Sequence, residues 1–333
     1  MTPGATAEMS KSGDSAQAPV AVIIVNYRTP GLAAAAARSA LDELAGIGGV
    51  LVFVDNHSED GSADSLSRFR DESPHRERIR LVPSERNDGF AAGTNCGVKT
   101  IAADTYILLN SDAAAEPGAI GEMLAVARAN SRAGLVTPML INGAGAIQSS
   151  RFRRHTPLSE FLDGARTGPL TRLFARAEVA IPPEDWETTP DWVSFAAVLI
   201  KAEAIAAVGP MDEGYFLYFE DCDYCRRIKR AGFEIAFAPL ARFRHDEGGS
   251  TGLKETASAG ARLPAYYYRA RNRYFRRHFG PAGPIAANLA WSLGRAIARL
   301  RGLLGRPAAP ASRGRFGDQW IGWLRPGRNS PNR

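Results

Sequence analysis

The sequence has few of the features that mark secreted, membrane-spanning or dinucleotide-binding proteins. Its three cysteines, Cys96, Cys222 and Cys225, are too few for a disulfide framework, which fits a reducing cytosol. No apolar run reaches the roughly 18 residues that a membrane-spanning helix needs. The first apolar strand runs into Asn-Tyr-Arg and lacks the G-x-G-x-x-G loop that lets backbone approach a pyrophosphate. A nicotinamide-dependent dehydrogenase is therefore disfavoured.

Lysine is absent from the C-terminal end, where arginine is concentrated instead. Residues 261–333 hold fifteen arginines and one acid, a net charge of +14, whereas the whole chain carries +6. The remaining residues therefore carry −8. An arginine-rich tail on an acidic body indicates contact with anions, such as phospholipid, nucleic acid or an acidic lipid-linked substrate. The first 18 residues are small and polar, and we expect a disordered leader there and no signal peptide.

Short apolar runs alternate with helical segments through most of the chain. This alternation predicts an α/β fold with a sheet of mostly parallel strands. The irregular stretch 148–191 is expected to form a loop over the sheet. The expected strands span 20–25, 50–54, 79–82, 106–109, 135–138, 191–200 and 234–238.

Polar side chains follow the apolar strand at 106–109, where an open α/β sheet binds its ligands. Asn110, Ser111 and Asp112 are these residues. A carboxylate with small neighbours suits a hard divalent cation, which in turn binds a diphosphate. An aspartate at this position is equally suited to capping the next helix. The strand alone leaves both interpretations open.

A second group of acids follows an aromatic run at 215–219. Glu220, Asp221 and Asp223 lie at the start of a predicted helix that ends near Gly232. Carboxylates there complement the helix dipole, which is the structural interpretation. A carboxylate held against apolar walls also takes a proton from a hydroxyl, which is the catalytic one. Cys222-x-x-Cys225 lies within this charged helix and lacks nearby partners for a zinc site.

Two basic helices are predicted near the C-terminus. The first, at 263–278, is rich in arginine and aromatic residues. In the second, apolar residues recur at steps of four, four, three and four and so share one face. The helix also carries arginines, which favours binding in a membrane interface. Packing on the sheet domain is the second interpretation, and binding of nucleic acid is the least favoured. The apolar residues are Leu289, Leu293, Ile297, Leu300 and Leu304, and the arginines are Arg295, Arg299 and Arg301.

Taken together, these motifs resemble the family 2 glycosyltransferases, in particular their bacterial rhamnosyltransferase-like branch, over roughly residues 21–277. The resemblance implies the A-type glycosyltransferase fold at 19–255, followed by a basic helical extension at 256–333. The motifs are Val-Asn26-Tyr27, Asp55-Asn56-x-Ser58-x-Asp60-Gly61, Asn87-x-Gly89-Phe-Ala-Ala-Gly-x-Asn95, Asn110-Ser-Asp112, Tyr218-Phe-Glu220-Asp221-x-Asp223 and Arg271-Asn272-Arg273.

The resemblance also implies roles for single residues. Asp221 matches the catalytic base, with Glu220 orienting the acceptor or exchanging roles with it. Asp112 matches the last acid of an Asp-x-Asp metal motif, and His245 resembles the histidine that completes the metal site. Asn110 replaces the first acid of that motif and removes one negative charge from it. Implied contacts to the nucleotide sugar are Asn26, Tyr27, Asp55, Asn87, Asn95 and Ser111.

The expected activity is inverting transfer of a sugar from a dTDP- or UDP-linked donor, with Mg²⁺ or Mn²⁺ as cofactor. Rhamnose is the first candidate for the sugar, and a lipid-linked or cell-envelope glycan is the expected acceptor. The tail suggests a peripheral position on the inner face of the cytoplasmic membrane, without nucleic acid. A non-catalytic scaffold of the same fold is the alternative from another class, although a scaffold would need neither Asp112 nor Asp221.

Overall fold

The structure is a computed structural model that describes residues 17–245, 260–306 and 310–324. Of the predicted leader, only residues 17 and 18 are among them. There, Ala18 is buried and pairs with Ala103 through an isolated parallel bridge. The predicted glycine-rich loop at 248–250 lies outside the described residues.

An eight-stranded sheet forms the centre of the molecule, in the order β3-β2-β1-β4-β9-β6-β10-β5. The neighbours from β3 to β4 are parallel, as are β6 and β10, while β9 and β5 run antiparallel to their neighbours. The predicted mostly parallel α/β sheet is therefore confirmed. Its strands are β1 (Ala21–Asn26), β2 (Val50–Asp55), β3 (Ile79–Pro83), β4 (Thr105–Leu109), β5 (Ala113–Ala115), β6 (Ala133–Ile141), β9 (Ala197–Lys201) and β10 (Glu234–His245).

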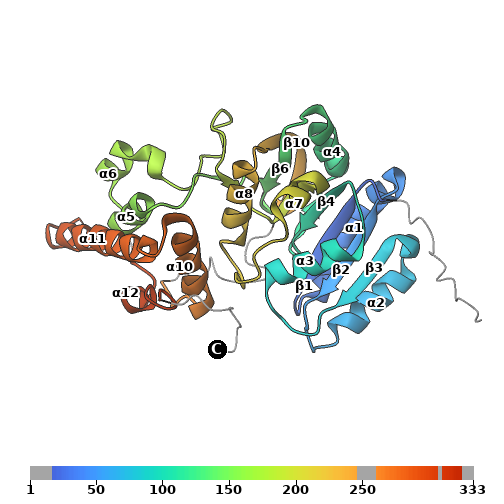
Figure 1. The fold of residues 1–333 in the computed structure, drawn as a ribbon, viewed down its shortest axis with the longest axis horizontal. Coiled ribbons are helices and arrows are strands. Elements are labelled where there is room, and N and C mark those ends of the chain that lie inside the picture. Colours follow the sequence, from blue (N-terminus) through green and yellow to red (C-terminus); the bar gives the residue numbers. More distant parts are fainter. Residues whose placement is uncertain (1–16, 246–259, 307–309, 325–333) are drawn as a thin grey trace, which may run out of the picture.

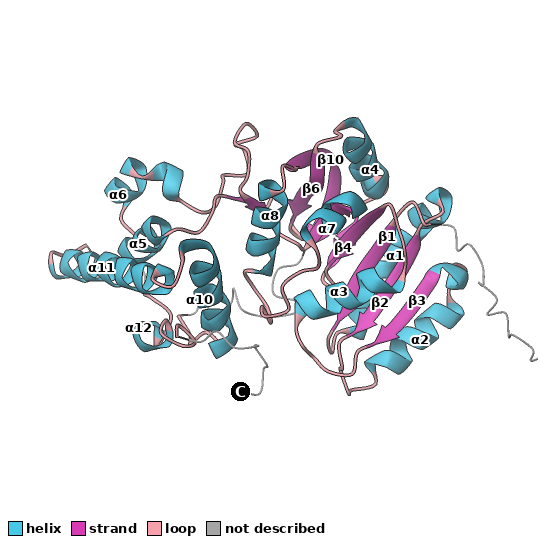
Figure 2. Cartoon of the chain, in the orientation of Figure 1, coloured by secondary structure: helices cyan, strands magenta, loops and turns pink. Residues whose placement is uncertain are grey.

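Helices cover both faces of this sheet, because its central strands are apolar on both sides. Helices α1 (Pro30–Ile47), α2 (Ser62–Glu72) and α4 (Ala119–Ala129) pack into one buried cluster. Helices α3 (Phe90–Thr100), α7 (Ala202–Val208) and α8 (Glu220–Arg230) pack into another on the opposite face. Figure 2 shows these layers, with the strand ends directed toward the lower edge of the sheet.

A separate group of helices, which we call the helical body, lies to the side of the sheet beyond α8 (Figure 1). Helices α5 and α11 cross at two glycines, where an added methyl on Gly164 would lie 2.3 Å from a backbone oxygen of α11 and one on Gly294 would lie 2.1 Å from a backbone oxygen of α5. The crossing therefore depends on bare backbone. The helical body consists of α5 (Pro157–Ala165), α6 (Gly168–Leu173), α10 (Ala265–Phe279), α11 (Gly283–Leu303) and α12 (Arg315–Asp318).

The expectation of a loop at 148–191 is wrong, because α5 and α6 form there. Thr156 caps α5 through a reciprocal pair of hydrogen bonds with Ser159, and a proline opens the first turn. Both features stabilise a helix start. These helices belong to the helical body, so that body draws on the middle of the chain as well as its end.

The single strand predicted at 191–200 is divided in two. Its first part, β8 (Trp192–Val193), pairs with β7 (Arg151–Phe152) in a small two-stranded sheet. The second part is β9, which enters the main sheet between β4 and β6. The break at residues 194–196 lets the chain pass from the helical body back to the core.

A buried ion network holds the helical body together. Arg271 of α10 is 1% exposed and forms two contacts with the Glu160 carboxylate of α5, at 3.0 and 2.8 Å. Arg315 of α12 approaches the same carboxylate at 3.2 Å. The Asn288 amide oxygen of α11 accepts from Arg271 at 2.6 Å. Four helices therefore meet in one network, and loss of the Glu160 carboxylate would leave its buried cations unpaired.

The predicted leucine stripe on α11 faces outward. Leu289, Leu293, Leu300 and Leu304 are 57–80% exposed, whereas Trp291 on the opposite side is buried. The alternative that the stripe packs on the sheet domain is therefore wrong. None of the helices within the described ranges is both long and apolar enough to cross a membrane.

Candidate active site

The carboxyl ends of β1 and β2 are joined by a buried polar network. The Asn26 amide donates to Asp55 Oδ1 at 2.8 Å and to the Ser58 hydroxyl at 3.2 Å. Its oxygen accepts from the backbone N–H of Thr29 at 3.2 Å. Ser58 also donates to Asp55 Oδ1 at 2.6 Å. Asn26 is fully buried and Asp55 nearly so, so the network fixes the shape of this end of the sheet. Tyr27, by contrast, is 41% exposed.

A second asparagine network lies after β3. Asn56 donates to Asn87 Oδ1 at 2.8 Å and to the Gly89 carbonyl at 3.1 Å. Gly89 has φ +93°, and a methyl group there would lie 1.9 Å from the carbonyl oxygen of Phe216. The next N–H, of Phe90, donates to that oxygen at 2.8 Å. Only glycine permits this approach, which brings the Asn87 loop against the segment leading to Glu220.

Asn95 joins the same two segments from α3. Its oxygen accepts from the Met211 N–H at 2.9 Å, and its amide donates to the Met211 carbonyl at 2.9 Å and to Glu213 at 3.0 Å. The side chain is 4% exposed and its polar atoms face the protein. Asn95 therefore positions the loop before α8, and its predicted contact with a nucleotide sugar stays a prediction.

Asp112 and His245 are brought together by strand pairing. The short strand β5 begins directly after Asp112 and pairs with β10 so that Ala113 lies opposite His245. His245 Nε2 is 3.6 Å from Asp112 Oδ1, and both side chains are largely buried. Ser111 is also buried and accepts a hydrogen bond from the Thr29 hydroxyl at 3.2 Å. The structure thus joins two of the predicted site residues that lie 133 positions apart.

The other ring nitrogen of His245 has a partner that sets its tautomer. Gln148 Nε2 donates to the His245 carbonyl at 3.0 Å, so the amide oxygen of Gln148 faces Nδ1, at 3.3 Å. An oxygen there can only accept, so Nδ1 carries the hydrogen. Nε2 then presents a lone pair toward Asp112. Such an arrangement is typical of a metal-binding histidine.

Asp112 and His245 are suitable donors for a divalent cation. Carboxylate oxygen suits both Mg²⁺ and Mn²⁺, and imidazole nitrogen favours Mn²⁺ slightly. Within the described part of the chain, however, no cluster of three or more His, Cys, Asp or Glu side chains could hold a metal. A cation here would therefore need ligands in addition to the described side chains. The presence of Asn110 in place of the first acid of the metal motif agrees with this small number of protein ligands.

Glu220 and Asp221 open helix α8, as predicted. The two residues before them, Tyr218 and Phe219, have φ values of +72° and +68°, which are costly for side chains of this size. Strain of this kind tends to occur at functional sites. The turn places both carboxylates in an apolar setting formed in part by Phe219, which is itself buried.

Burial controls the protonation of this pair. It raises the pKa of Asp221 to about 6, although a hydrogen bond from the Cys222 N–H at 2.7 Å favours the ionised form. Burial and the nearby Asp221 carboxylate raise the pKa of Glu220 well above its ordinary value. Glu220 Oε2 has no hydrogen-bond partner among the described residues. Both carboxyl groups therefore hold their protons more tightly than ordinary acidic side chains do.

Asp223, the third acid of the motif, has a different setting. It is 1% exposed and contacts two guanidinium groups and one imidazole ring. The nearest atoms are His278 Nε2 at 2.8 Å, Arg277 Nε at 3.0 Å and Arg227 Nε at 3.2 Å. Two of these partners belong to α10, so Asp223 attaches α8 to the helical body. Asp212 makes a similar attachment by binding Arg273 and Arg277.

Several residues of the site were missed in the sequence interpretation. Gln148 lies in the stretch expected to be a plain loop, and Asp212 lies in an unremarked turn. Their partners, His245 and Arg273, are 97 and 61 positions away. No local pattern connects such pairs. The motif residues Asn56 and Ser58 did carry a signal, because they belong to the quoted Asp55 motif.

Comparison with known proteins agrees with this geometry. A family model described as "Glycosyltransferase like family 2" matches residues 17–264. The N-acetylglucosaminyl-diphospho-decaprenol L-rhamnosyltransferase of Mycobacterium tuberculosis is 25% identical over 285 residues, which are 80% of this chain and 86% of that protein. Rhamnosyltransferase WbbL of Escherichia coli is 26% identical over 104 residues, which are 31% of this chain and 37% of that one.

A solved structure shows the same fold. The mannosyltransferase PcManGT from Pyrobaculum calidifontis, in complex with GDP-Man and Mn²⁺, matches with a TM-score of 0.54 and 14% sequence identity. The match covers 87% of this chain and 76% of that one. The predicted A-type glycosyltransferase fold, followed by C-terminal helices, is therefore confirmed.

Proposed function

Because this chain belongs to glycosyltransferase family 2, we propose that it transfers a sugar, with inversion, from a nucleoside-diphosphate donor to a hydroxyl of a lipid-linked glycan. The observation that carries this proposal is the pair of adjacent carboxylates, Glu220 and Asp221, which the strained turn before them places at the start of α8. An ionised carboxylate whose pKa is raised to about 6 is a stronger base than an ordinary aspartate and still accepts protons at neutral pH.

Asp221 is the base in this mechanism. The acceptor oxygen attacks the anomeric carbon from the face opposite the leaving group, and its proton passes to Asp221. The bond between the anomeric carbon and the donor phosphate breaks, and its electron pair leaves with the nucleoside diphosphate. Glu220, whose pKa is raised well above its ordinary value by burial and by the Asp221 charge, serves as a hydrogen-bond donor to the acceptor. The buried setting keeps water from competing for the base.

Asp112 and His245 would hold the divalent cation. A bound cation stabilises negative charge on a departing diphosphate. Gln148 keeps the imidazole in the tautomer that presents Nε2 to this position. The Mn²⁺ in the solved mannosyltransferase complex supports this assignment. The networks around Asp55 and Asn87 would form the walls of the nucleotide site.

The sugar and the acceptor follow from the relatives. Rhamnose is the proposed sugar, since both relatives described above are named as rhamnosyltransferases. The name of the mycobacterial relative also includes a diphospho-decaprenol. A diphosphate-linked lipid of that kind is the proposed acceptor here, with dTDP or UDP as the carrier of the donor sugar.

The exposed leucine stripe of α11 supports a peripheral position on the membrane. Its leucines are flanked by Arg299 and Arg301, which suits a surface that is apolar in its interior and anionic in its headgroups. We expect the chain to bind vesicles that contain anionic lipid. A Leu289→Asp/Leu293→Asp variant should bind them at least about tenfold less, and Leu240→Asp, a change at an exposed leucine of β10, should not.

The activity is tested first by thermal melting with dTDP, UDP, GDP and NAD, each with and without Mn²⁺. A ligand that binds only the folded state raises the melting temperature. We expect one nucleoside diphosphate to do so in a Mn²⁺-dependent way, and Asp112→Ala to abolish that dependence. A shift with NAD alone, or with none of the diphosphates, would contradict the proposal. A positive result selects the donor for transfer assays.

A further inference from the structure

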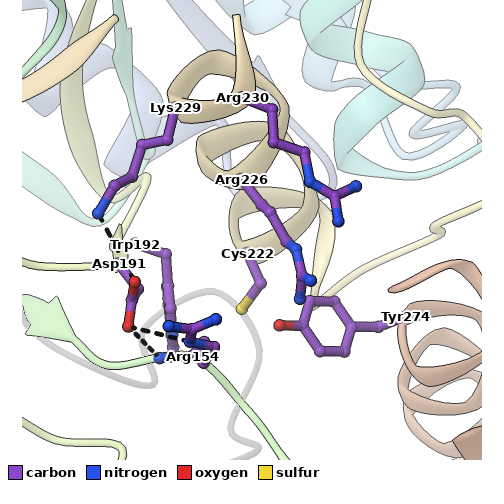
Figure 3. Close-up of a pocket in the computed structure, with 8 residues that line it drawn as sticks. All are labelled: Arg154, Asp191, Trp192, Cys222, Arg226, Lys229, Arg230 and Tyr274. Carbon is purple, nitrogen blue, oxygen red and sulfur yellow. Dashed lines mark hydrogen bonds and ion pairs between the residues drawn. The ribbon is translucent and has the colours of Figure 1, made fainter. Parts of the chain in front are cut away.

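A basic cavity of about 310 Å³ lies between α8, the β7–β8 segment and α10. Figure 3 shows side chains from all three elements directed into it. Cys222 projects from the first turn of α8, and Tyr274 of α10 faces it from the opposite side. The charged lining consists of Arg154, Arg226, Lys229, Arg230 and Asp191.

The positive charge of this cavity is only partly neutralised. Asp191 is shared between Arg154, at 3.8 Å, and Lys229, at 3.6 Å. Arg226 and Arg230 have no carboxylate partner within the described ranges. Arg226 lies over the ring of Phe279, at 5.4 Å, and its Nη1 is buried without a hydrogen-bond acceptor among those residues. Four cations and one carboxylate thus leave an excess of three positive charges.

The cavity reaches the first turn of α8, the turn that also carries Asp221. Cys222, which lines it, directly follows Asp221. Because an α-helix rises 1.5 Å per residue, Arg226 and Arg230 lie about 7.5 and about 13.5 Å along α8 from Asp221. A hexose followed by a diphosphate extends over a comparable distance. An acceptor whose sugar hydroxyl meets Asp221 would therefore place its diphosphate beside the unpaired arginines.

We propose that this cavity binds the diphosphate that joins the acceptor sugar to its lipid. The proposal rests on the proposed function and adds the residues that recognise the acceptor. Guanidinium groups bind phosphate oxygens through paired, charge-assisted hydrogen bonds, for which Arg226 and Arg230 have donors available. Asp191 holds Arg154 and Lys229 at the rim, so the site needs no rearrangement of its cations before the ligand enters.

A neighbouring cavity gives the lipid a path away from the site. This cavity, of about 630 Å³, shares Arg154 and Asp191 with the first and extends along α5 and α6. Its lining there combines Leu158 and Leu173, which are 40% and 72% exposed, with three further arginines, Arg153, Arg172 and Arg176. A lipid chain leaving the diphosphate would pass over these leucines along the helical body, which also carries the exposed α11 stripe.

Binding of farnesyl diphosphate, farnesol and inorganic diphosphate tests the proposal by calorimetry on the full chain. The buffer contains EDTA, so that no cation at Asp112 and His245 can bind the diphosphate. We expect farnesyl diphosphate to bind at least about tenfold more tightly than either of the other two compounds. The Arg226→Gln/Arg230→Gln variant should remove at least about tenfold of that affinity and leave farnesol binding unchanged.

The matched control is Arg68→Gln/Arg128→Gln, which removes the same charge from exposed positions on α2 and α4. It should bind farnesyl diphosphate like the unchanged chain. Equal losses of farnesyl diphosphate affinity in the two variants would show that net charge alone causes the effect, and would overturn the proposed site. Inorganic diphosphate binding as tightly as farnesyl diphosphate would overturn the assignment to a lipid-linked acceptor.

The outcome is separable from that of the proposed function. In the Arg226→Gln/Arg230→Gln variant, the Mn²⁺-dependent melting shift with a nucleoside diphosphate should remain. Loss of that shift in the variant would assign the cavity to the donor and overturn the proposal. Absence of the shift in the unchanged chain would contradict the proposed function itself, whatever the farnesyl diphosphate titration shows.

Discussion

Carboxylates with ion-pair partners and carboxylates without them lie close together in this molecule. Glu220 and Asp221 have no ion-pair partner among the described residues, and burial raises the pKa of both. Asp223, two residues later, is surrounded by His278, Arg277 and Arg227. Glu160 in the helical body is likewise held by two arginines. The first turn of α8 therefore contains both kinds of carboxylate. Glu220 and Asp221 can exchange protons, and Asp223 holds elements of the structure together.

The difference shows that carboxylates of one short acidic motif can have two separate roles. An unpaired buried carboxylate costs stability but gains proton affinity, which a base requires. A paired one keeps its charge and fixes its neighbours. Arg271, Arg273 and Arg277 of α10 serve that second purpose, so they are not available to anions. Arg226 and Arg230 of α8 are available, because no carboxylate in the described part of the chain pairs with them.

The largest expected effect comes from removing the charge of Asp221, the proposed base. Asp221→Asn keeps the shape of the side chain and removes its charge, so transfer should fall by about 10³-fold. The melting temperature should not fall, because a buried charge without a partner has been removed. Rates and melting curves on the same preparation measure both. An equal loss of donor binding and transfer would contradict the role of Asp221 as base.

The opposite change is expected for a paired carboxylate. Glu160→Gln leaves Arg271 and Arg315 buried with a neutral partner, and should lower the free energy of unfolding by about 3 kcal/mol. Denaturant melts of this variant measure the loss. Glu122→Gln, at an exposed position on α4, serves as the control and should change stability little. A Glu160 variant as stable as the control would remove the distinction between the two groups.

A third carboxylate, Asp112, sharpens the comparison, because it faces a histidine whose tautomer is fixed by Gln148. Gln148→Leu removes the acceptor at Nδ1 and should weaken Mn²⁺ binding by about 10- to 100-fold in the presence of the nucleoside diphosphate. Titration of the melting shift with Mn²⁺ gives the affinity. Gln148→Glu, which keeps an acceptor, should retain it. Equal affinities in the Leu variant and the unchanged chain would contradict the inferred tautomer.

The pH dependence of transfer and of stability tests the role of Asp221 directly. Since Asp221 must be ionised to act, kcat/KM should fall about tenfold per pH unit below about 6 and level off above it. Stability should change in the opposite direction. The pKa is raised in the folded state, so stability is highest below the ordinary pKa of an aspartate and is partly lost as the pH rises toward 6. In Asp221→Asn, that part of the loss should disappear.

The smallest effect is expected at Glu220. Burial raises the pKa of Glu220 well above its ordinary value and so favours the neutral form, which glutamine matches in shape and charge. Glu220→Gln should therefore lower transfer by no more than about threefold. The acid limb near pH 6 should remain. A loss as large as that of Asp221→Asn would exchange the roles of the two residues.

Much of the sheet was predictable, because its strands are short apolar runs with turns between them. The start of α8 at Glu220 was predictable for the same reason, since a helical pattern follows the aromatic run. Strand β5 was not, because three alanines carry no strand signal. Its pairing with β10 is nevertheless what brings His245 to Asp112. The convergence of those two residues was expected from the family resemblance alone.

The helical body was harder to predict than the sheet. Helix α5 had a local signal in Thr156, Pro157 and Ser159, which the surrounding irregular sequence obscured. The partners of Arg271 lie on other helices, and no sequence pattern distinguishes its buried guanidinium from the exposed one of Arg299. The basic cavity depends on the same long-range packing, because its walls come from three separated segments. The positions of these segments relative to one another are set by tertiary contacts, which a local sequence pattern does not predict.

The contact between Gly89 and Phe216 has a consequence for the order of kinetic events. One backbone hydrogen bond, from Phe90 to Phe216, joins the loop beside the proposed nucleotide site to the segment that ends in Asp221. A shift of that loop on nucleotide binding would therefore move the segment that leads to Asp221, the proposed base. We therefore expect a compulsory sequence, with the donor bound first and the nucleoside diphosphate released last. Product-inhibition patterns in steady-state assays would reveal it.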